Sequence, residues 1–118
     1  MKTYKDLVVW QKATALALEI YRATDTFPKT EVWGLSSQMR RASVSIASNI
    51  AEGKLRGGEK EWRYFLLIAF GSGGELETQL HIAKELGFMN TSSYQAVSNL
   101  LNEVMRMLNV MISKASKS

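Results

Sequence analysis

The chain has 118 residues, of which 46% are hydrophobic and 22% are charged. This length is enough to bury the core of one domain, and the composition is ordinary for a soluble globular protein. The chain contains no cysteine, which excludes disulfides and thiolate metal sites. A formal net charge of +4 at pH 7 permits an acidic partner such as nucleic acid, but an ordinary basic surface is the simpler explanation.

The first residues, Met1 to Asp6, lack the apolar run of a signal peptide. No apolar stretch approaches the roughly 18 residues that a membrane-spanning helix needs. We therefore expect a cytoplasmic protein with no membrane contact.

The first expected helix begins between Thr3 and Asp6, either of which can cap free backbone amides. It ends at Phe27, because the residue before Pro28 is pushed out of helical geometry. Heptad-like spacing relates one set of residues along it: Trp10, Ala13, Ala17, Ile20, Tyr21 and Thr24. A second set widens the apolar surface, which predicts burial on two sides: Leu7, Val8, Val9, Leu16 and Leu18.

The next helix restarts either at Thr30, with Glu31 at its positive end, or only after Gly34. It continues to Arg56 and is expected to be the central packing element. At 100° per residue, one side of it is apolar: Leu35, Met39, Ala42, Ile46 and Ile50. The opposite side is polar: Arg41, Ser45, Ser48, Asn49 and Glu52. A third strip of Val44, Ala47 and Ala51 lies between them.

A third helix is expected from Glu59 to Leu86. Its interior holds Gly71, Gly73 and Gly74, which together cost about 2–3 kcal/mol relative to alanine. Either the helix breaks there, or another backbone packs tightly against it. The apolar phase runs unbroken from Trp62 to Ala83, which favours one helix with close helix packing at the three glycines.

The fourth helix follows Gly87, a natural C-terminal cap, and a run of candidate N-caps from Asn90 to Ser93. Strict a/d spacing relates its apolar residues: Tyr94, Val97, Leu101, Val104, Leu108 and Met111. Four long helices with short connections predict an all-α fold, an antiparallel up-down four-helix bundle. We expect it to form a single domain over residues 1–118, with a polar tail from about residue 114 to 118.

Signals for catalysis or metal binding are weak. His81 is the only histidine and falls at the edge of its helix's apolar face. Glu75 and Glu77 diverge on a helix, and no Glu-x-x-His motif is present. The glycine run lacks the Gly-Lys-Ser/Thr of a phosphate loop and follows no strand. We expect no enzyme activity, no cofactor and no metal.

The polar strip of the central helix has two interpretations. In the first, it is a solvated face or a structural polar network, in which Asn49 fixes register and Glu52 pairs with Arg56 four residues later. In the second, it is a functional surface that meets phosphates or an acidic protein. The candidate nucleic-acid-binding residues are Arg40, Arg41, Lys54 and Arg56.

Several motifs resemble one known family. They are Val9-Trp10-Gln11, Phe27-Pro28 with Glu31 and Gly34-Leu35, Gln38-Met-Arg-Arg-Ala42, Ser45-Ile-Ala-Ser-Asn-Ile-Ala-Glu-Gly53, and Ala69-Phe-Gly-Ser72 with Glu75-Leu76. The chain resembles, over about residues 4 to 88, the bacterial four-helix-bundle proteins encoded in intervening sequences of large-subunit ribosomal RNA genes. This family is also labelled ribosomal protein-like, and it includes the accessory variability protein of diversity-generating retroelements. Ala47 stands where many relatives carry proline.

The resemblance implies an up-down bundle that assembles as a ring-shaped homopentamer. For the retroelement branch it also implies a basic surface that binds nucleic acid and a reverse transcriptase partner. It implies no enzyme activity. The leading hypothesis is therefore a non-catalytic oligomer that binds structured RNA, DNA or a nucleic-acid-processing partner. The alternative is a protein-binding or structural oligomer with no nucleic-acid role.

Oligomerisation is also expected from the residues themselves. The first helix has apolar residues on two sides, and the third carries a second apolar set: Leu67, Ile68, Ile82 and Leu86. A monomer would leave these as an exposed apolar patch, which soluble monomers rarely tolerate.

Overall fold

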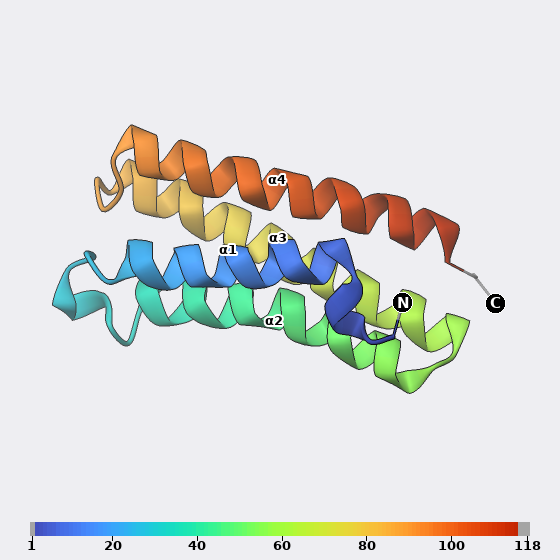
Figure 1. The fold of residues 1–118 in the computed structure, drawn as a ribbon. Coiled ribbons are helices and arrows are strands. Elements are labelled where there is room, and N and C mark those ends of the chain that lie inside the picture. Colours follow the sequence, from blue (N-terminus) through green and yellow to red (C-terminus); the bar gives the residue numbers. More distant parts are fainter. Residues whose placement is uncertain (1, 116–118) are drawn as a thin grey trace.

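The computed structural model describes residues 2–115 and contains four α-helices joined by short connections (Figure 1). The helices are α1 (Val8–Thr24), α2 (Leu35–Arg56), α3 (Glu59–Glu85) and α4 (Thr91–Lys114), with 3-10 turns η1 (Tyr4–Asp6) and η2 (Lys29–Glu31). Consecutive helices run up and down, and α4 returns to pack against α1. No strand occurs in the described part of the chain. The predicted all-α four-helix bundle is confirmed.

The bundle has two ends with different contents. The α2–α3 turn, the N-terminal segment and the end of α4 lie at one end, and the α1–α2 connection and the α3–α4 turn lie at the other (Figure 1). The 3-10 turn η1 folds back against α2, so the first residues are packed onto the end of that helix. None of the described helices is both long and apolar enough to cross a membrane.

The core follows the predicted helical faces in α2, α3 and α4. In α1 the buried face is Val9, Ala13, Leu16, Ile20 and Thr24, and Tyr21 of the predicted heptad set is exposed. The largest fully buried side chains come from all four helices: Leu16, Ile20, Met39, Ile46, Ile50, Leu66, Leu76, Leu80, Leu101 and Leu108. The expected second apolar set of α3 is largely outside this core, because Leu67, Ile82 and Leu86 are exposed.

Local capping residues fix the helix ends. Thr3 and Asp6 form a capping box, but it caps the 3-10 turn η1. The first long helix, α1, begins only at Val8 and ends at Thr24, so its predicted bounds near Thr3–Asp6 and Phe27 are wrong by a few residues. The second helix begins only after Gly34, and the Glu31 carboxylate accepts a hydrogen bond from the Leu35 amide at 3.0 Å. Asn90 caps α4 by accepting from the Ser93 amide at 2.8 Å. Gly87, with φ of 78°, ends α3 in the left-handed conformation predicted for it.

The three glycines of α3 do not share one role. The helix is continuous through all of them, so the alternative of a break is wrong. Gly73 is buried, and a Cβ there would collide with the Sδ of Met105 on α4. Beside Gly71 and Gly74 there is open space within the chain. The prediction of close packing is therefore wrong for Gly71 and Gly74, and at Gly73 the neighbour is a flexible side chain rather than a backbone.

The closest helix approach lies at Gly53, which the sequence did not single out for packing. Gly53 is buried between α2 and α3, and a Cβ there would lie 2.8 Å from the Cβ of Phe65 and 3.0 Å from the ring of Trp62. The Cβ atom of Phe65 moves only together with its backbone. A Cβ added at position 53 could therefore be accommodated only if the backbone of α3 shifted. Gly53 thus sets the distance between α2 and α3 near the turn that joins them.

We predict that Gly53→Ala destabilises the fold, whereas Gly71→Ala does not. Overpacking typically costs about 1–3 kcal/mol, which outweighs the gain of up to about 1 kcal/mol in helix propensity. At Gly71 only the propensity gain applies, so that variant should be slightly more stable than the wild type. Urea unfolding of the two variants measures both effects, and an unchanged or raised stability of Gly53→Ala would contradict the close approach.

Candidate nucleic-acid interface

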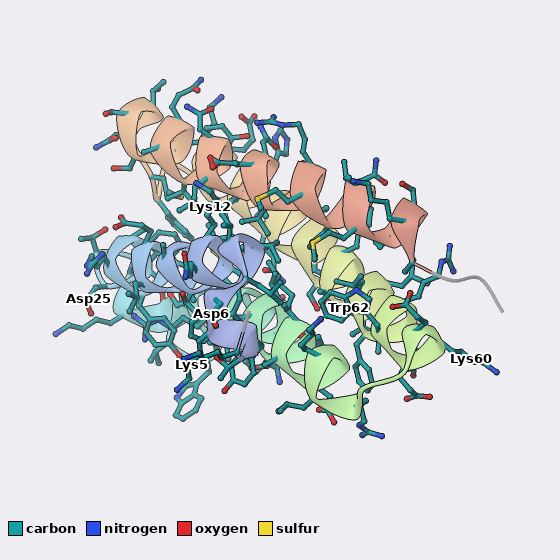
Figure 2. All side chains as sticks on the ribbon, turned by 45° about the vertical axis from the view of Figure 1, so that its right-hand side comes forward. Lys5, Asp6, Lys12, Asp25, Lys60 and Trp62 are labelled. Atoms are coloured by element: carbon teal, nitrogen blue, oxygen red, sulfur yellow. The ribbon has the colours of Figure 1, made fainter. Side chains whose placement is uncertain are left out.

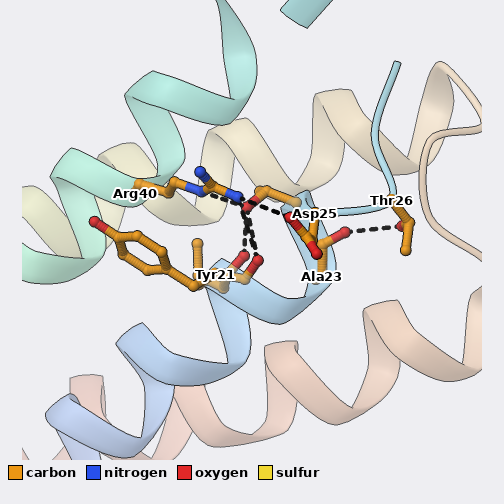
Figure 3. A network of polar contacts seen from close by, with 7 residues as sticks. Tyr21, Ala23, Asp25, Thr26 and Arg40 are labelled. Carbon is orange, nitrogen blue, oxygen red and sulfur yellow. Dashed lines mark hydrogen bonds and ion pairs between the residues drawn. The ribbon is translucent and has the colours of Figure 1, made fainter. Parts of the chain in front are cut away.

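Arg40 is a structural residue that holds the end of α1 to α2 (Figure 3). Its Nε donates to Thr24 Oγ1 at 2.8 Å, and its Nη2 donates to the Tyr21 carbonyl at 3.4 Å. The guanidinium lies over the Tyr21 ring at 4.7 Å and is 3.9 Å from an Asp25 carboxylate oxygen. The Tyr21 carbonyl already accepts from the Asp25 amide at 3.1 Å, so Arg40 adds a second donor there and places its charge at the negative end of the α1 dipole. Arg40 is therefore committed to an internal contact.

Arg41, the neighbouring residue, points the other way. It is exposed, and no hydrogen bond or ion pair joins it to another described residue. Successive helical residues diverge by about 100°, so the inward position of Arg40 sends Arg41 to the surface. Of these two arginines, only Arg41 can meet an external partner without breaking a contact of the fold.

Lys54 and Arg56 lie at the other end of α2, each against an aromatic ring of α3. The Lys54 ammonium is 5.4 Å from the centre of the Trp62 ring, and the Arg56 guanidinium is 5.2 Å from that of Phe65. Both basic residues are exposed. Trp62 and Phe65 are also the residues whose side chains lie against Gly53. The close contact of α2 with α3 therefore positions Lys54 and Arg56.

The four predicted binding residues do not form one cluster. Arg41 and Lys54 are about 20 Å apart along the axis of α2, and they belong to opposite ends of the bundle. The reason is the length of α2, which carries its first and last turns to different ends.

The predicted polar network is present in two separate parts. Asn49 Nδ2 donates to the Ser45 carbonyl at 2.8 Å, and Ser45 Oγ hydrogen-bonds Ser72 Oγ of α3 at 2.9 Å. Glu52 belongs to neither of these contacts and instead accepts from Arg56 at 2.8 Å, which is the predicted ion pair. This hydrogen bond, together with the charges of Glu52 and Glu61, raises the pKa of the Arg56 guanidinium.

Further cations lie toward the α2–α3 end. Lys2, from the N-terminal segment, lines one hollow together with Lys54. Lys5, from the same segment, and Lys60, in the first turn of α3, are exposed and lie well apart from each other (Figure 2). We call Lys2, Lys5, Lys54, Arg56 and Lys60 the basic end. Sequence reasoning missed the three lysines outside α2, because no periodicity shows that the N-terminal segment folds back onto that helix.

Two acids at the basic end are already engaged. The Asp6 carboxylate accepts from the backbone amides of Lys2 and Thr3, at 2.8 and 3.1 Å, and these hydrogen bonds hold the pKa of Asp6 below its ordinary value. Glu52 is paired with Arg56. Glu61, in the first turn of α3, is close enough to affect Arg56. The lysines are therefore the cations of this end that are most available to an anionic ligand.

An apolar groove runs along the outer face of α1 and α2. It has a volume of about 570 Å³, and its lining is Tyr4, Trp10, Thr14, Ala17, Leu18, Tyr21, Val44, Ala47, Ser48 and Ala51. Leu18 is 57% exposed there, and Tyr21 and Val44 are also exposed. At the end of the bundle away from the basic end, Trp33 is 91% exposed in the connection before α2. These are apolar surfaces that the monomer leaves uncovered.

No group of three or more His, Cys, Asp or Glu side chains that could hold a metal ion occurs among residues 2–115. His81 is exposed and lines a hollow between α3 and α4 with Glu77, Tyr94, Ser98, Leu101 and Asn102. No hydrogen bond joins His81 to a hydroxyl or carboxylate among the described residues.

Comparison with known proteins places the chain in a family. A family model described as 23S rRNA-intervening sequence protein matches residues 5–110. The chain belongs to this family. The resemblance drawn from the sequence motifs is thereby confirmed. No match was found among curated proteins.

A solved structure has the same fold. It is a crystal structure of a protein with unknown function from the S23 ribosomal protein family of Bacteroides thetaiotaomicron VPI-5482. The similarity covers 91% of this chain and 100% of that chain, with a TM-score of 0.82 and 23% sequence identity. At this identity the comparison supports the bundle fold and nothing further about the ligand.

We predict that Arg40→Gln and Arg41→Gln differ in stability although the residues are adjacent. Loss of charged hydrogen bonds at the end of α1 should cost about 1.5–3 kcal/mol for Arg40→Gln. Arg41→Gln changes an exposed side chain and should stay within about 0.5 kcal/mol of the wild type. Urea denaturation followed by circular dichroism compares them. Equal stabilities would show that Arg40 does not hold α1 to α2.

Proposed function

We propose that this protein is a non-catalytic, oligomeric helical bundle that binds nucleic acid through its basic end. The observation that supports the proposal is that exposed Lys2 and Lys54, from two separate elements, line one hollow at this end, with Lys5 and Lys60 exposed on the N-terminal segment and on α3. Asp6 and Glu52 at this end are held by backbone amides and by Arg56. Glu59 and Glu61 flank Lys60 in the first turn of α3, whereas the hollow lined by Lys2 and Lys54 has no acid among its described lining residues, so a polyanion is expected to contact those two ammonium groups first.

The chemistry of such a surface is that of phosphate contact. Exposed lysines bind phosphates as point charges and release the counterions condensed on the nucleic acid. Contacts of this kind position the ligand without reading its sequence. Membership in a family described by an intervening sequence of 23S rRNA makes RNA the first ligand to test.

We propose that the functional form is a closed homo-oligomer. The groove on α1 and α2 and the exposed Trp33 both carry apolar surface that a second copy would remove from water. Val44 is the groove residue of α2 that lies nearest to Trp33 in the sequence, and it is about 13 Å along the helix axis from the start of α2. The Trp33 side chain therefore does not fill the groove of its own chain. A contact from Trp33 of one copy to the groove of the next is head-to-tail, which is the kind that closes rings. The resemblance points to five subunits.

Oligomerisation would also strengthen nucleic-acid binding. A ring repeats the basic end once per subunit, and several weak sites on one particle act together when their spacing lets one ligand reach them. A mild net charge of +4 per chain is then multiplied by the number of subunits.

The second candidate function is a protein-binding scaffold. The same groove, with its small residues Ala17, Ala47 and Ala51, can accept an apolar helix from a different protein. A nucleic-acid-processing protein, such as the reverse transcriptase that the resemblance suggests, is one partner of this kind. Binding of nucleic acid by the isolated protein separates this candidate from the first.

We predict that RNA binding depends strongly on salt and on the basic end. Replacing Lys2, Lys5, Lys54 and Lys60 with glutamine should weaken binding and reduce the slope of log K against log salt by about 0.7–0.9 for each phosphate that is no longer neutralised. The matched control replaces with glutamine four exposed cations outside the basic end: Arg22, Lys29, Lys84 and Arg106. Fluorescence anisotropy from 50 to 200 mM salt measures both slopes. No binding by the wild-type oligomer at 50 mM salt would reject the nucleic-acid function.

We predict that the wild-type protein is larger than its monomer mass of 13.2 kDa. Leu18→Glu places a carboxylate in the groove and Trp33→Ser removes the exposed ring, so each should shift the assembly toward monomer. Val110→Glu is the control, because Val110 is 50% exposed on α4, away from the groove. Light scattering after size exclusion gives the masses. A wild-type monomer at micromolar concentration would reject the oligomer.

A further inference from the structure

A small hollow lies where the N-terminal segment folds back on the end of α2. It has a volume of about 320 Å³ and is lined by Lys2, Thr3, Tyr4, Lys54 and Leu55. Small-ligand sites occupy roughly 300–1,000 Å³, so the hollow is of a size for one small group rather than for a protein element. Its lining combines two cations with an aliphatic and an aromatic side chain.

Leu55 contributes neither to the hydrophobic core nor to a helix cap. It is 73% exposed, although it lies in the last turn of α2 between two basic residues, Lys54 and Arg56. Tyr4 is half-buried and holds its ring edge-on to Trp10, with the ring centres 5.4 Å apart. The hollow thus has an apolar side that is fixed in place and open to solvent.

The two lysines lie beside this apolar side without an acid among the described lining residues. Lys54 is held by its contact with the Trp62 ring at 5.4 Å. The nearby carboxylate of Asp6 is turned to the backbone amides of Lys2 and Thr3, from which it accepts at 2.8 and 3.1 Å. Positive charge therefore adjoins an apolar surface within one hollow.

This combination distinguishes between forms of nucleic acid. A duplex presents phosphates to a protein surface and keeps the faces of its bases stacked inside, so it offers Leu55 and Tyr4 no partner. An unpaired nucleotide offers both a phosphate and an uncovered base face. Bases stack on aromatic and apolar side chains with little regard to sequence.

We propose that the hollow binds an unpaired nucleotide of a nucleic-acid strand, with the base against Leu55 and Tyr4 and the adjoining phosphates at Lys2 and Lys54. This inference rests on the proposed nucleic-acid function and names the class of ligand at the basic end. It assigns Leu55 to base contact, and it assigns the flanking lysines to affinity without sequence preference. In an oligomer each subunit carries one such hollow, next to the groove, since Tyr4 lines both.

The test compares a 12-nucleotide oligouridylate with a 12-base-pair RNA duplex at equal salt, using the full chain and fluorescence anisotropy. We expect the oligouridylate to bind at least fivefold more tightly. Leu55→Asn should weaken oligouridylate binding about fivefold and leave its salt slope unchanged, because leucine carries no charge. Lys54→Gln should instead reduce that slope by about 0.7.

Leu86→Asn is the matched control, since Leu86 is a 58% exposed leucine that follows α3 at the opposite end of the bundle. It should bind both RNAs as the wild type does. Circular dichroism and light scattering of Leu55→Asn should match the wild type, which ties its weaker binding to the hollow and not to folding or assembly.

The outcomes separate this inference from the proposed function. If the wild type binds the duplex and oligouridylate with equal affinity, or if Leu55→Asn binds oligouridylate as tightly as the wild type, the hollow is not a base-binding site. The proposed nucleic-acid function would not be affected by either result. No binding of either RNA rejects the nucleic-acid function itself. Binding of phosphatidylserine vesicles that Leu55→Asn abolishes, with no RNA binding, assigns the hollow to a lipid surface and overturns both.

Discussion

The close contact of α2 with α3 at Gly53 is the constraint on which the basic end depends. No side chain larger than hydrogen fits between the backbone of α2 and the Cβ of Phe65 at 2.8 Å. Farther along the same pair of helices, Ser45 and Ser72 hydrogen-bond at 2.9 Å, which satisfies polar atoms that a close approach would otherwise bury without partners. The helices thus stay close over several turns. Their closeness brings Lys54 over Trp62 and Arg56 over Phe65.

The basic residues of α2 serve two different ends of the bundle. At the first, Arg40 joins α1 to α2 through the Thr24 hydroxyl and the Tyr21 carbonyl, at the negative end of the α1 dipole. At the second, Lys54 and Arg56 are exposed on aromatic supports beside lysines from two other elements. Arginine suits the first task because its planar fork donates in two directions at once. Flexible lysine suits the second, since phosphates of a nucleic acid arrive without a fixed geometry.

Apolar surface and positive charge are placed on different parts of the molecule. The groove follows the flank of α1 and α2, whereas the basic end lies at the α2–α3 turn. A second copy seated in the groove can therefore leave the cations exposed to a ligand. Tyr4 belongs to both the groove and the hollow, so assembly and nucleotide binding meet at one side chain. Such a separation is what a scaffold needs if it is to assemble and bind at the same time.

The sequence by itself determined the four helices, their caps and their buried faces. These features are local: the spacing of Ile46 and Ile50, the capping by Thr3 and Asn90 and the positive φ of Gly87 depend only on residues within a few turns. The ion pair of Glu52 with Arg56 was predictable for the same reason, because both residues lie on one helix four positions apart.

Only the tertiary structure decided which neighbouring residues each helix face contacts. Gly53 and Gly71 are both glycines within helices, yet one is closed in by Phe65 and the other has open space beside it, and no periodicity distinguishes them. Helical periodicity puts Arg41 on the polar side of α2, but only the structure places Thr24 and Tyr21 beside Arg40. Lys2 joins Lys54 only because the N-terminal segment folds back onto α2. Helical periodicity fixes the direction of a side chain from its own axis, but the neighbour in that direction is set by the packing of the whole bundle.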